Sequence, residues 1–325
     1  MRFRSSREST ITCSLTDELI FYVDYKILIY LIMKTSRRNF LIQSGLLTTA
    51  ATLGAPGFNN ALFANPPSKM KLGLVTYLWG KDWDLPTLIT NCEESKLSGV
   101  ELRTEHAHGV EAHLTKSERI EVKKRFEDSP LTLVGYGSNY AYDHTDPEEL
   151  NKSIEDTKKY ILLCHDIGAT GIKVKPNQFH EGIPHEQTIE QIGNSLNILG
   201  KFGADYGQEI RLEVHGPGTS ELRNIKKIMD IADHPNVGVC WNCNDEDLLG
   251  EGLAYNFNLV KDRLGATLHV RELNTGSYPY QELFTLLVKM DYDGWILLEC
   301  RTDPEDKVAA LIEQDQVFKK MIKDA

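Results

Sequence analysis

The stretch that decides the fold reads Gly171-Ile172-Lys173-Val174-Lys175, then a long amphipathic segment, then Ile210-Arg211-Leu212-Glu213-Val214-His215. In both short runs apolar and charged residues alternate, which is the period of a β-strand with two different faces. The segment between the runs has the length and polarity pattern of a surface helix. The stretch therefore predicts one strand–helix–strand unit of an α/β fold.

The same rhythm recurs along the chain. The candidate strands are Leu72–Trp79, Val100–Arg103, Leu131–Tyr136, Gly171–Lys175, Ile210–His215, Val237–Asn242, Thr267–Glu272 and Trp295–Arg301. Eight strands alternating with eight helices over about 250 residues predict a single (β/α)8 TIM barrel. The alternative is a doubly wound sheet, which usually carries a glycine-rich turn after its first strand. Here Leu78-Trp79-Gly80-Lys81 stands at that place.

Helix boundaries carry their own signals. Thr115 followed by Glu118 predicts a capping box, and Asp146 followed by Pro147 predicts an N-cap with proline in the first turn. Glycines are typical of helix C-termini. We expect helices to end at Gly168, Gly207, Gly265 and Gly294.

Composition describes an ordinary globular protein. The 325 residues are 41% hydrophobic and carry a formal net charge of −11, which excludes a collagen-like or largely disordered chain. The acidic balance also argues against a general nucleic-acid binder, which needs a basic face. We therefore expect no nucleic-acid partner.

Charge is uneven near the N-terminus, where residues 25–81 contain no Asp or Glu. Within this gap Ser36-Arg37-Arg38-Asn39-Phe40-Leu41 precedes a mildly apolar run and resembles a twin-arginine export signal. We interpret Met33 as the start, residues 1–32 as a non-native upstream extension, 33–64 as the signal peptide and 70–323 as the barrel. The prediction is an exported, periplasmic protein with no membrane segment after signal cleavage. Residues 65–325 carry a net charge of −14.

In a TIM barrel the chemistry lies at the carboxyl ends of the strands. Period-2 alternation there points Glu213, Asn242, His269 and Glu299 inward from four successive strands. Two buried carboxylates facing each other repel unless a cation or a proton separates them. Carboxylate, amide and imidazole groups suit Mn²⁺, Mg²⁺, Co²⁺ or Zn²⁺, so we predict a divalent metal site at these four residues. Singly, each inward Glu could instead form an ion pair, with Arg211 or Arg301 as the partner.

From residue 70 to 323 the chain resembles the sugar phosphate isomerase/epimerase superfamily with the xylose isomerase-like barrel. The resemblance rests on four runs: Gly99-Val100-Glu101-Leu102-Arg103, Leu212-Glu213-Val214-His215, Leu268-His269-Val270, and Gly294-Trp295-Ile296 leading to Glu299. It implies a metal quartet of Glu, Asp, His and Glu, of which Asn242 replaces the Asp. The site then carries two carboxylates instead of three, so we expect weaker metal binding, and complete loss of the metal is an open alternative.

The resemblance implies proton abstraction next to a carbonyl, with Glu213 and Glu299 as the catalytic pair on opposite sides of the substrate carbon. The predicted function is a metal-dependent isomerase or epimerase of sugars or keto-sugars. One alternative is a lyase or dehydratase of keto-glycosides, and another is a non-catalytic carbohydrate-binding barrel. Oligomerisation is left open. The expected contacts of the sugar substrate are His215, Lys173, Glu101, His106, His108 and Arg301. Two alternatives stay open: Lys173 could meet Glu213, and Glu101 could pair with Arg103.

Overall fold

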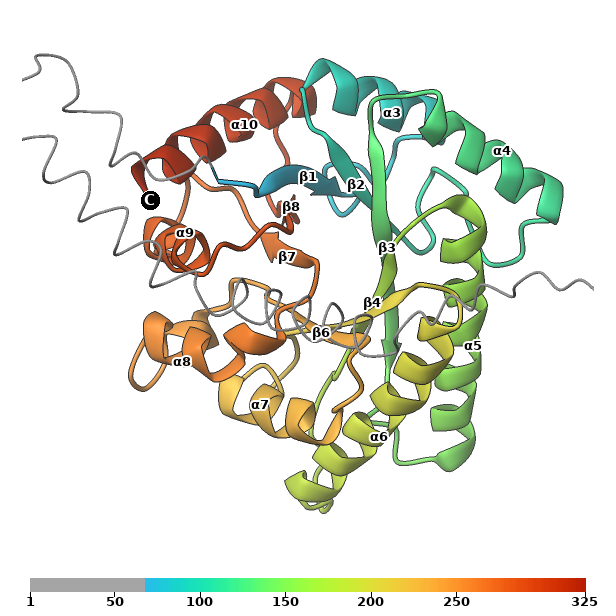
Figure 1. Cartoon of the computed structure of the whole chain (residues 1–325), viewed down its shortest axis with the longest axis vertical. Helices are drawn as coiled ribbons and strands as arrows, with labels where there is room; N and C mark the ends of the chain where they lie inside the picture. The colour runs from blue at the N-terminus through green and yellow to red at the C-terminus, as the bar shows by residue number, and fades with distance from the viewer. Residues whose placement is uncertain (1–67) are drawn as a thin grey trace, which may run out of the picture. The chain divides into compact units, whose positions relative to one another are not determined.

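The computed structural model describes residues 68–325, which form a ring of parallel strands surrounded by helices (Figure 1). The predictions on residues 1–32 and 33–64, including the export signal, lie outside the described residues. The strands are β1 Lys71–Val75, β2 Gly99–Arg103, β3 Thr132–Ala141, β4 Gly171–Lys175, β5 Glu209–Glu213, β6 Val237–Cys240, β7 Thr267–Val270 and β8 Trp295–Leu298. The helices are α3 Leu85–Glu94, α4 Lys116–Glu127, α5 Pro147–Ile167, α6 His185–Ala204, α7 Leu222–Ile231, α8 Leu253–Val260, α9 Tyr280–Lys289 and α10 Lys307–Asp324. Two short 3₁₀ helices, η1 Asp245–Leu248 and η2 Lys261–Arg263, follow β6 and α8.

The strand order β6-β5-β4-β3-β2-β1-β8-β7 follows the chain around the ring, which confirms the (β/α)8 barrel over the doubly wound sheet. The ring closes between β6 and β7 without a regular ladder. Two backbone hydrogen bonds lie at this seam: the Gly265 N–H donates to the Val239 carbonyl (2.9 Å), and the His269 N–H donates to the Trp241 carbonyl (2.7 Å). The seam therefore lies beside the carboxyl ends that carry the candidate site.

Several strands end earlier than expected. The first one stops at Val75, and Leu78-Trp79-Gly80 forms a turn instead of strand. The sixth and eighth strands stop at Cys240 and Leu298, so Asn242 and Glu299 lie just beyond them. β3 is longer than predicted and reaches Ala141. The physical reason is pairing, because a strand continues only while a neighbour offers its backbone groups, whatever the alternation of its side chains.

The helix signals are confirmed in part. Thr115 and Glu118 form the expected capping box, and Asp146 caps α5 by accepting from the Glu148 N–H with Pro147 in the first turn. Gly168 ends α5 in the left-handed conformation at φ 84°. The other three glycines were wrong as helix ends: α6 ends at Ala204 and is capped by Asp205, well before Gly207. Gly265 and Gly294 lie just before strands β7 and β8.

The amino-terminal end of the barrel interior is filled by Arg211. Its guanidinium is fully buried and donates to the Glu209 carboxylate (2.7 Å), the Val134 carbonyl (3.2 Å) and the Thr170 hydroxyl (2.8 Å). Gly135 leaves the space for it, since a Cβ there would lie 2.5 Å from Arg211 Nη1. The expectation that Arg211 could pair with Glu213 is therefore wrong, because the Arg211 guanidinium pairs with Glu209, nearer the amino-terminal end of the barrel.

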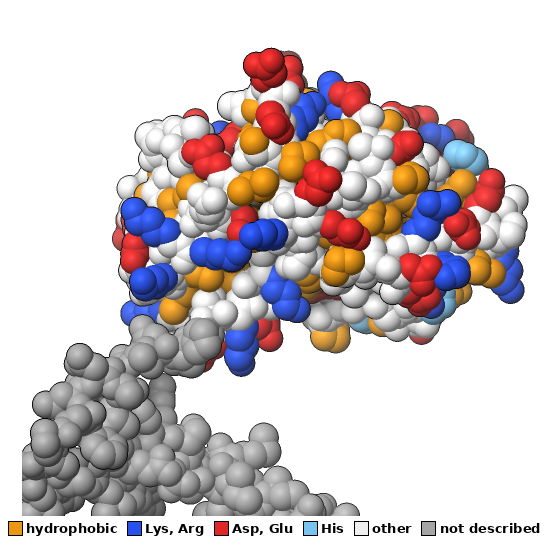
Figure 2. Space-filling view, turned by 90° about the horizontal axis from the view of Figure 1, so that it is seen from above, with side chains coloured by type: hydrophobic (Ala, Val, Ile, Leu, Met, Phe, Trp, Pro, Cys, Tyr) orange, Lys and Arg blue, Asp and Glu red, His pale blue; other side chains and the backbone are white. Residues whose placement is uncertain are grey.

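The outer surface is mixed. On the face shown in Figure 2, acidic and basic side chains are interspersed among apolar ones. Within residues 68–325, no helix is both long enough and apolar enough to cross a membrane. The five cysteines of this part of the chain are buried and form no disulfide with one another.

Candidate functional site

Three potential ligands meet at the carboxyl end of the barrel. Glu213 is the last residue of β5, His269 lies within β7, and Glu299 follows β8 directly. His269 Nδ1 lies 3.7 Å from Glu213 Oε1 and 3.8 Å from Glu299 Oε1, and all three side chains are buried. The structure thus brings together three of the four residues expected to hold a metal, with their ligand atoms within 4.8 Å of one another.

Each carboxylate also has its own cation. Lys173 Nζ, fully buried on β4, lies 2.7 Å from Glu213 Oε2. Arg103 Nη1, at the end of β2, lies 2.8 Å from Glu299 Oε1. The guanidinium of Arg103 also donates to Asn139 Oδ1 (2.8 Å). Two negative and two positive charges are therefore arranged in pairs, which is the condition under which charges remain buried at moderate cost.

The orientation of His269 is set from behind by Glu101. Glu101 Oε1 lies 3.1 Å from His269 Nε2, and neither residue has any exposed surface. Neither ring nitrogen of His269 makes a hydrogen bond of ordinary geometry among the described residues, so the contact between Nε2 and Glu101 is one of charge and proximity. A carboxylate behind one ring nitrogen leaves the other nitrogen free to ligate, which is the usual arrangement of a metal-binding histidine. Glu101 is thus enclosed behind the imidazole, and this position differs from the substrate contact that we expected of it.

Burial and charge act against each other on the Glu213 carboxyl. Burial raises its pKa, but Lys173 and His269 outweigh burial and hold the pKa well below the usual range. Glu213 is therefore ionised at neutral pH, which suits both a metal ligand and a proton acceptor.

Asn242 lies at the site in an orientation that the sequence did not predict. Its Nδ2 donates a hydrogen bond of 2.9 Å to Glu213 Oε1, the same oxygen that faces His269. An amide nitrogen carries no lone pair for a cation, so in this orientation the group that meets Glu213 is a donor and not a ligand.

The donor set fits a divalent cation. Carboxylate oxygens and a histidine nitrogen are ordinary ligands, with bonds of about 2.0–2.2 Å for Zn²⁺. Separations of 3.7 and 3.8 Å between these atoms allow one ion to reach all of them. The observation that supports this fit most directly is that His269 Nδ1 is buried, has no hydrogen bond among the described residues and faces both carboxylates.

Three of the expected substrate contacts already have partners within the protein. His108 is buried between two backbone groups: Nε2 meets the Arg103 carbonyl (2.8 Å) and Nδ1 accepts from the Val110 N–H (3.0 Å), so it holds the loop. His106 is close to the Thr76 hydroxyl (3.1 Å), and burial lowers its pKa to about 4. Lys173 forms an ion pair with Glu213, so its ammonium group contacts a site carboxylate.

The two remaining predicted contacts lie farther out. His215 follows β5 and has a buried Nδ1 for which no partner is found among the described residues. Burial lowers the pKa of His215. The Arg301 side chain is exposed, and Arg103 takes the place beside Glu299 that we considered for it.

Sequence reasoning did not recognise the roles of Arg103 and Asn139. Arg103 shares an inward face with Glu101, so alternation along β2 indicated its direction but not its partner. Asn139 lies beyond the point where we expected β3 to end, and its contact with Arg103 depends on the true length of that strand.

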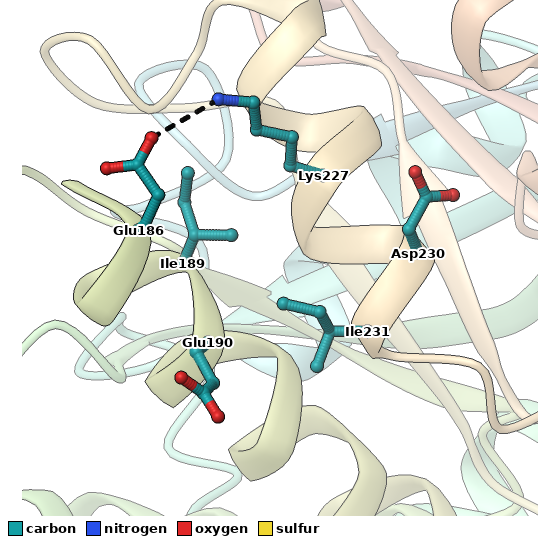
Figure 3. Close-up of a pocket in the computed structure, with 6 residues that line it drawn as sticks. All are labelled: Glu186, Ile189, Glu190, Lys227, Asp230 and Ile231. Atoms are coloured by element: carbon teal, nitrogen blue, oxygen red, sulfur yellow. Dashed lines mark ion pairs between the residues drawn. The ribbon is translucent and has the colours of Figure 1, made fainter.

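A hollow that is unrelated to these residues lies on the outside of the barrel between α6 and α7 (Figure 3). Lys227 Nζ and Glu186 Oε1 approach to 3.6 Å across it. None of the predicted site residues lines it. The lining residues are Glu186, Ile189, Glu190, Lys227, Asp230 and Ile231.

Comparison with known proteins agrees with this fold. The family model described as a xylose isomerase-like TIM barrel matches residues 89–321. An inosose dehydratase from Bacillus thuringiensis (strain Al Hakam) is 22% identical, over 72% of this chain and 91% of its own length. The structure of a 3-keto-D-glucoside 4-epimerase from E. coli superposes with a TM-score of 0.66 at 16% identity, covering 77% of this chain and 99% of that one. The IOLI protein with a bound zinc atom superposes with a TM-score of 0.65 at 14% identity, covering 78% and 98%.

Proposed function

The chain belongs to the xylose isomerase-like TIM barrel family, and from that premise we propose that it is a metal-dependent enzyme that removes and returns a proton next to the carbonyl of a keto-sugar. One observation carries the proposal. Two buried carboxylates, each paired with a cation, approach the same unpartnered imidazole nitrogen of His269 to 3.7 and 3.8 Å. Relatives named as a dehydratase and a keto-sugar epimerase support the substrate class.

In this proposal Glu213, His269 and Glu299 hold the cation, which is Mn²⁺, Mg²⁺, Co²⁺ or Zn²⁺. When bound, such an ion supplies Lewis-acid polarisation of a carbonyl oxygen and stabilises the negative charge that develops there. Glu213 accepts the α-proton on one face of the substrate carbon. In an epimerisation Glu299, after taking up a proton from water, delivers that proton on the other face. Loss of the proton on Glu213 to water then restores the starting state. Lys173 and Arg103 fix the direction of the two carboxylates, so that less reorganisation is needed during proton transfer.

A dehydratase is the second candidate, because the same proton removal can expel a neighbouring hydroxyl group. That reaction needs a proton donor for the leaving oxygen. Lys175 ends β4, next to the strand that carries Glu213, and no ion pair involving it is found within residues 68–325. Burial, with Lys173 nearby, lowers the pKa of Lys175 to about 8, so its ammonium group is a suitable donor at neutral pH.

Deuterium uptake tests the proposal before any product is known. Wild-type protein with Mn²⁺ in D₂O should exchange the α-proton of at least one ketone in a panel of keto-sugars, inososes and 3-keto-glycosides. Glu213→Gln and Glu299→Gln should each lower this rate by about 100-fold or more. Glu155→Gln, which changes an exposed carboxylate on α5, is the control and should keep the wild-type rate.

Two results would contradict the enzyme. One is full exchange in either carboxylate variant. The other is a protein whose stability is indifferent to Mn²⁺ and which exchanges no ketone in the panel. The second result would favour the non-catalytic carbohydrate-binding barrel.

We also propose that the chain is exported through the twin-arginine route to the periplasm, on the strength of the Arg37-Arg38 pair and the acid-free segment around it. The five reduced, buried cysteines of the barrel are compatible with folding in the cytoplasm.

A further inference from the structure

We propose that Asn242 is a positioning residue that holds Glu213 through its amide N–H, and that the metal centre of this chain is built from three residues instead of four. The inference deepens the proposed function, since it concerns the same site. It assigns to Asn242 a role different from the ligand role that its place in the family pattern implies.

Both carboxylate oxygens of Glu213 accept a hydrogen bond from a neighbouring side chain. Oε2 accepts from Lys173 Nζ (2.7 Å), and Oε1 accepts from Asn242 Nδ2 (2.9 Å). Glu213 is thus held at both ends, and Oε1 still faces His269 Nδ1 at 3.7 Å. The amide and the imidazole approach Oε1 together, so Asn242 determines where that oxygen points.

The chemistry of the amide group fixes which end of Asn242 faces Glu213. Only the nitrogen end of an amide can donate to a carboxylate, and the oxygen end would be repelled by it. Asn242 is 3% exposed, so water offers little alternative partner for a flipped amide. Turning Oδ1 toward a cation would break the bond to Glu213 and leave a carboxylate oxygen and a carbonyl oxygen in contact.

The charges around the site favour a neutral side chain at position 242. Glu213 and Glu299 are balanced by Lys173 and Arg103, and Glu101 faces His269. A carboxylate at position 242 would lie within about 3 Å of Glu213 Oε1 with no cation of its own, and like charges at that distance destabilise each other strongly unless an ion separates them. The neutral amide therefore produces a centre that is already assembled without an ion.

The consequence is a weakly held, exchangeable metal on a preformed site. Three protein ligands leave more coordination positions open to substrate oxygens than four do, as in catalytic zinc sites. A bound metal would then raise the affinity of the site for substrate and the reactivity of the bound carbonyl, and the barrel would fold without it.

Side-chain amide NMR on the full-length protein tests the orientation directly. With ¹⁵N-asparagine labelling, the Nδ2 signal assigned through Asn242→Ala should show one strongly downfield proton that exchanges slowly with solvent. Both features should persist after loading with Zn²⁺, which is diamagnetic. Loss of the downfield proton on Zn²⁺ loading would mean that the amide turns its oxygen to the metal, and would overturn the proposal.

Asn242→Asp provides the second readout. In chelator this variant should unfold at lower urea concentration than wild type, because two carboxylates then face each other. Mn²⁺ should restore its stability, with a dissociation constant at least tenfold lower than that of wild type by calorimetry. Wild-type stability of the variant in chelator would contradict the charge argument.

Asn197→Asp is the matched control. It makes the same chemical change on α6, where the amide Nδ2 donates to the Ile231 carbonyl (2.8 Å) and Oδ1 accepts from the His234 N–H (3.0 Å). Its loss of stability should not be reversed by Mn²⁺. All of these measurements report structure and metal binding, so they remain informative if no ketone is found to exchange deuterium and the proposed reaction is wrong.

Discussion

At the scale of single residues, the site is a set of matched charges. Lys173 Nζ pairs with Glu213 Oε2 at 2.7 Å, and Arg103 Nη1 pairs with Glu299 Oε1 at 2.8 Å. All four side chains are almost completely buried. Removing one partner of such a pair leaves a buried charge uncompensated, which costs more than the pair contributes when intact. The residues around the centre therefore matter for stability as well as for chemistry.

Lys173→Met tests that dependence. In chelator we expect the free energy of unfolding to fall by about 3–5 kcal/mol, because the Glu213 carboxylate loses its cation in a fully buried position. Lys159→Met is the control, since Lys159 pairs with Asp156 on the surface, where such a pair is worth about 0–1 kcal/mol. Urea titration of both variants measures the difference. Equal losses in the two would show that burial does not amplify this pair.

Asp247 has a separate, pH-dependent effect on stability. It is fully buried on η1 and accepts from the Tyr278 hydroxyl (2.7 Å) and the Asn244 N–H (2.9 Å), while Oδ1 has no partner among the described residues. Burial raises the pKa of Asp247 to about 7. Between about pH 4, the pKa of an unfolded-chain Asp, and about pH 7 the folded protein keeps a proton that the unfolded chain releases. Its contribution to stability therefore falls as pH rises through this window.

Asp247→Asn should remove that contribution, because an amide does not titrate and its oxygen can still accept. Urea unfolding at several pH values between 4 and 8 should show a shallower decline for the variant than for wild type. Parallel curves for the two proteins would assign the pH dependence to other groups.

At the scale of elements, the loops at the carboxyl ends support one another. Gly216, after β5, has a φ of 95°, and a Cβ there would lie 1.4 Å from the carbonyl oxygen of Asn177 in the loop after β4. The Thr219 hydroxyl lies 2.6 Å from the same carbonyl oxygen. The position of His215, which precedes Gly216, therefore depends on close backbone contact between two loops.

Gly216→Ala should separate these loops. We expect a loss of unfolding free energy of about 1–3 kcal/mol from backbone strain alone, with a further loss from the contact with Asn177. A raised KM should accompany it if His215 contacts the substrate. Gly250→Ala is the control, because Gly250 has a φ of 64° but nothing within 4 Å of the added Cβ. Identical losses by thermal unfolding in both variants would mean that the loop contact contributes nothing.

At the scale of the whole molecule, the proposed export signal lies outside the residues that form the barrel. Changing both Arg37 and Arg38 to Lys should retain the protein in the cytoplasm of a bacterial host that has twin-arginine export, because the arginine pair is the feature by which such a signal is recognised. Cell fractionation and immunoblotting measure this. Folding and metal affinity of the retained protein should equal those of wild type, and unchanged export would contradict the signal.

The sequence by itself determined the barrel and the inward direction of its polar side chains. Period-2 alternation in Ile210–His215 and its equivalents is a local property, and so are the caps at Thr115 and Asp146 and the acid-free segment near the N-terminus. Such features require only neighbours along the chain. They predicted that Glu213, His269 and Glu299 would point to one place, and the structure brings these three side chains together.

Only the tertiary structure decided which charges meet. Of the partners that the sequence left open, Glu213 pairs with Lys173 and not with Arg211, whereas the pair of Glu299 with Arg103 was not predicted. The direction of the Asn242 amide is likewise set by the position of Glu213. These choices depend on the stagger between strands that are 29 to 196 residues apart in the chain, and alternation along a single strand contains no information about stagger. For that reason the sequence could name the residues of the centre but could not distinguish the ligands from the groups that hold them.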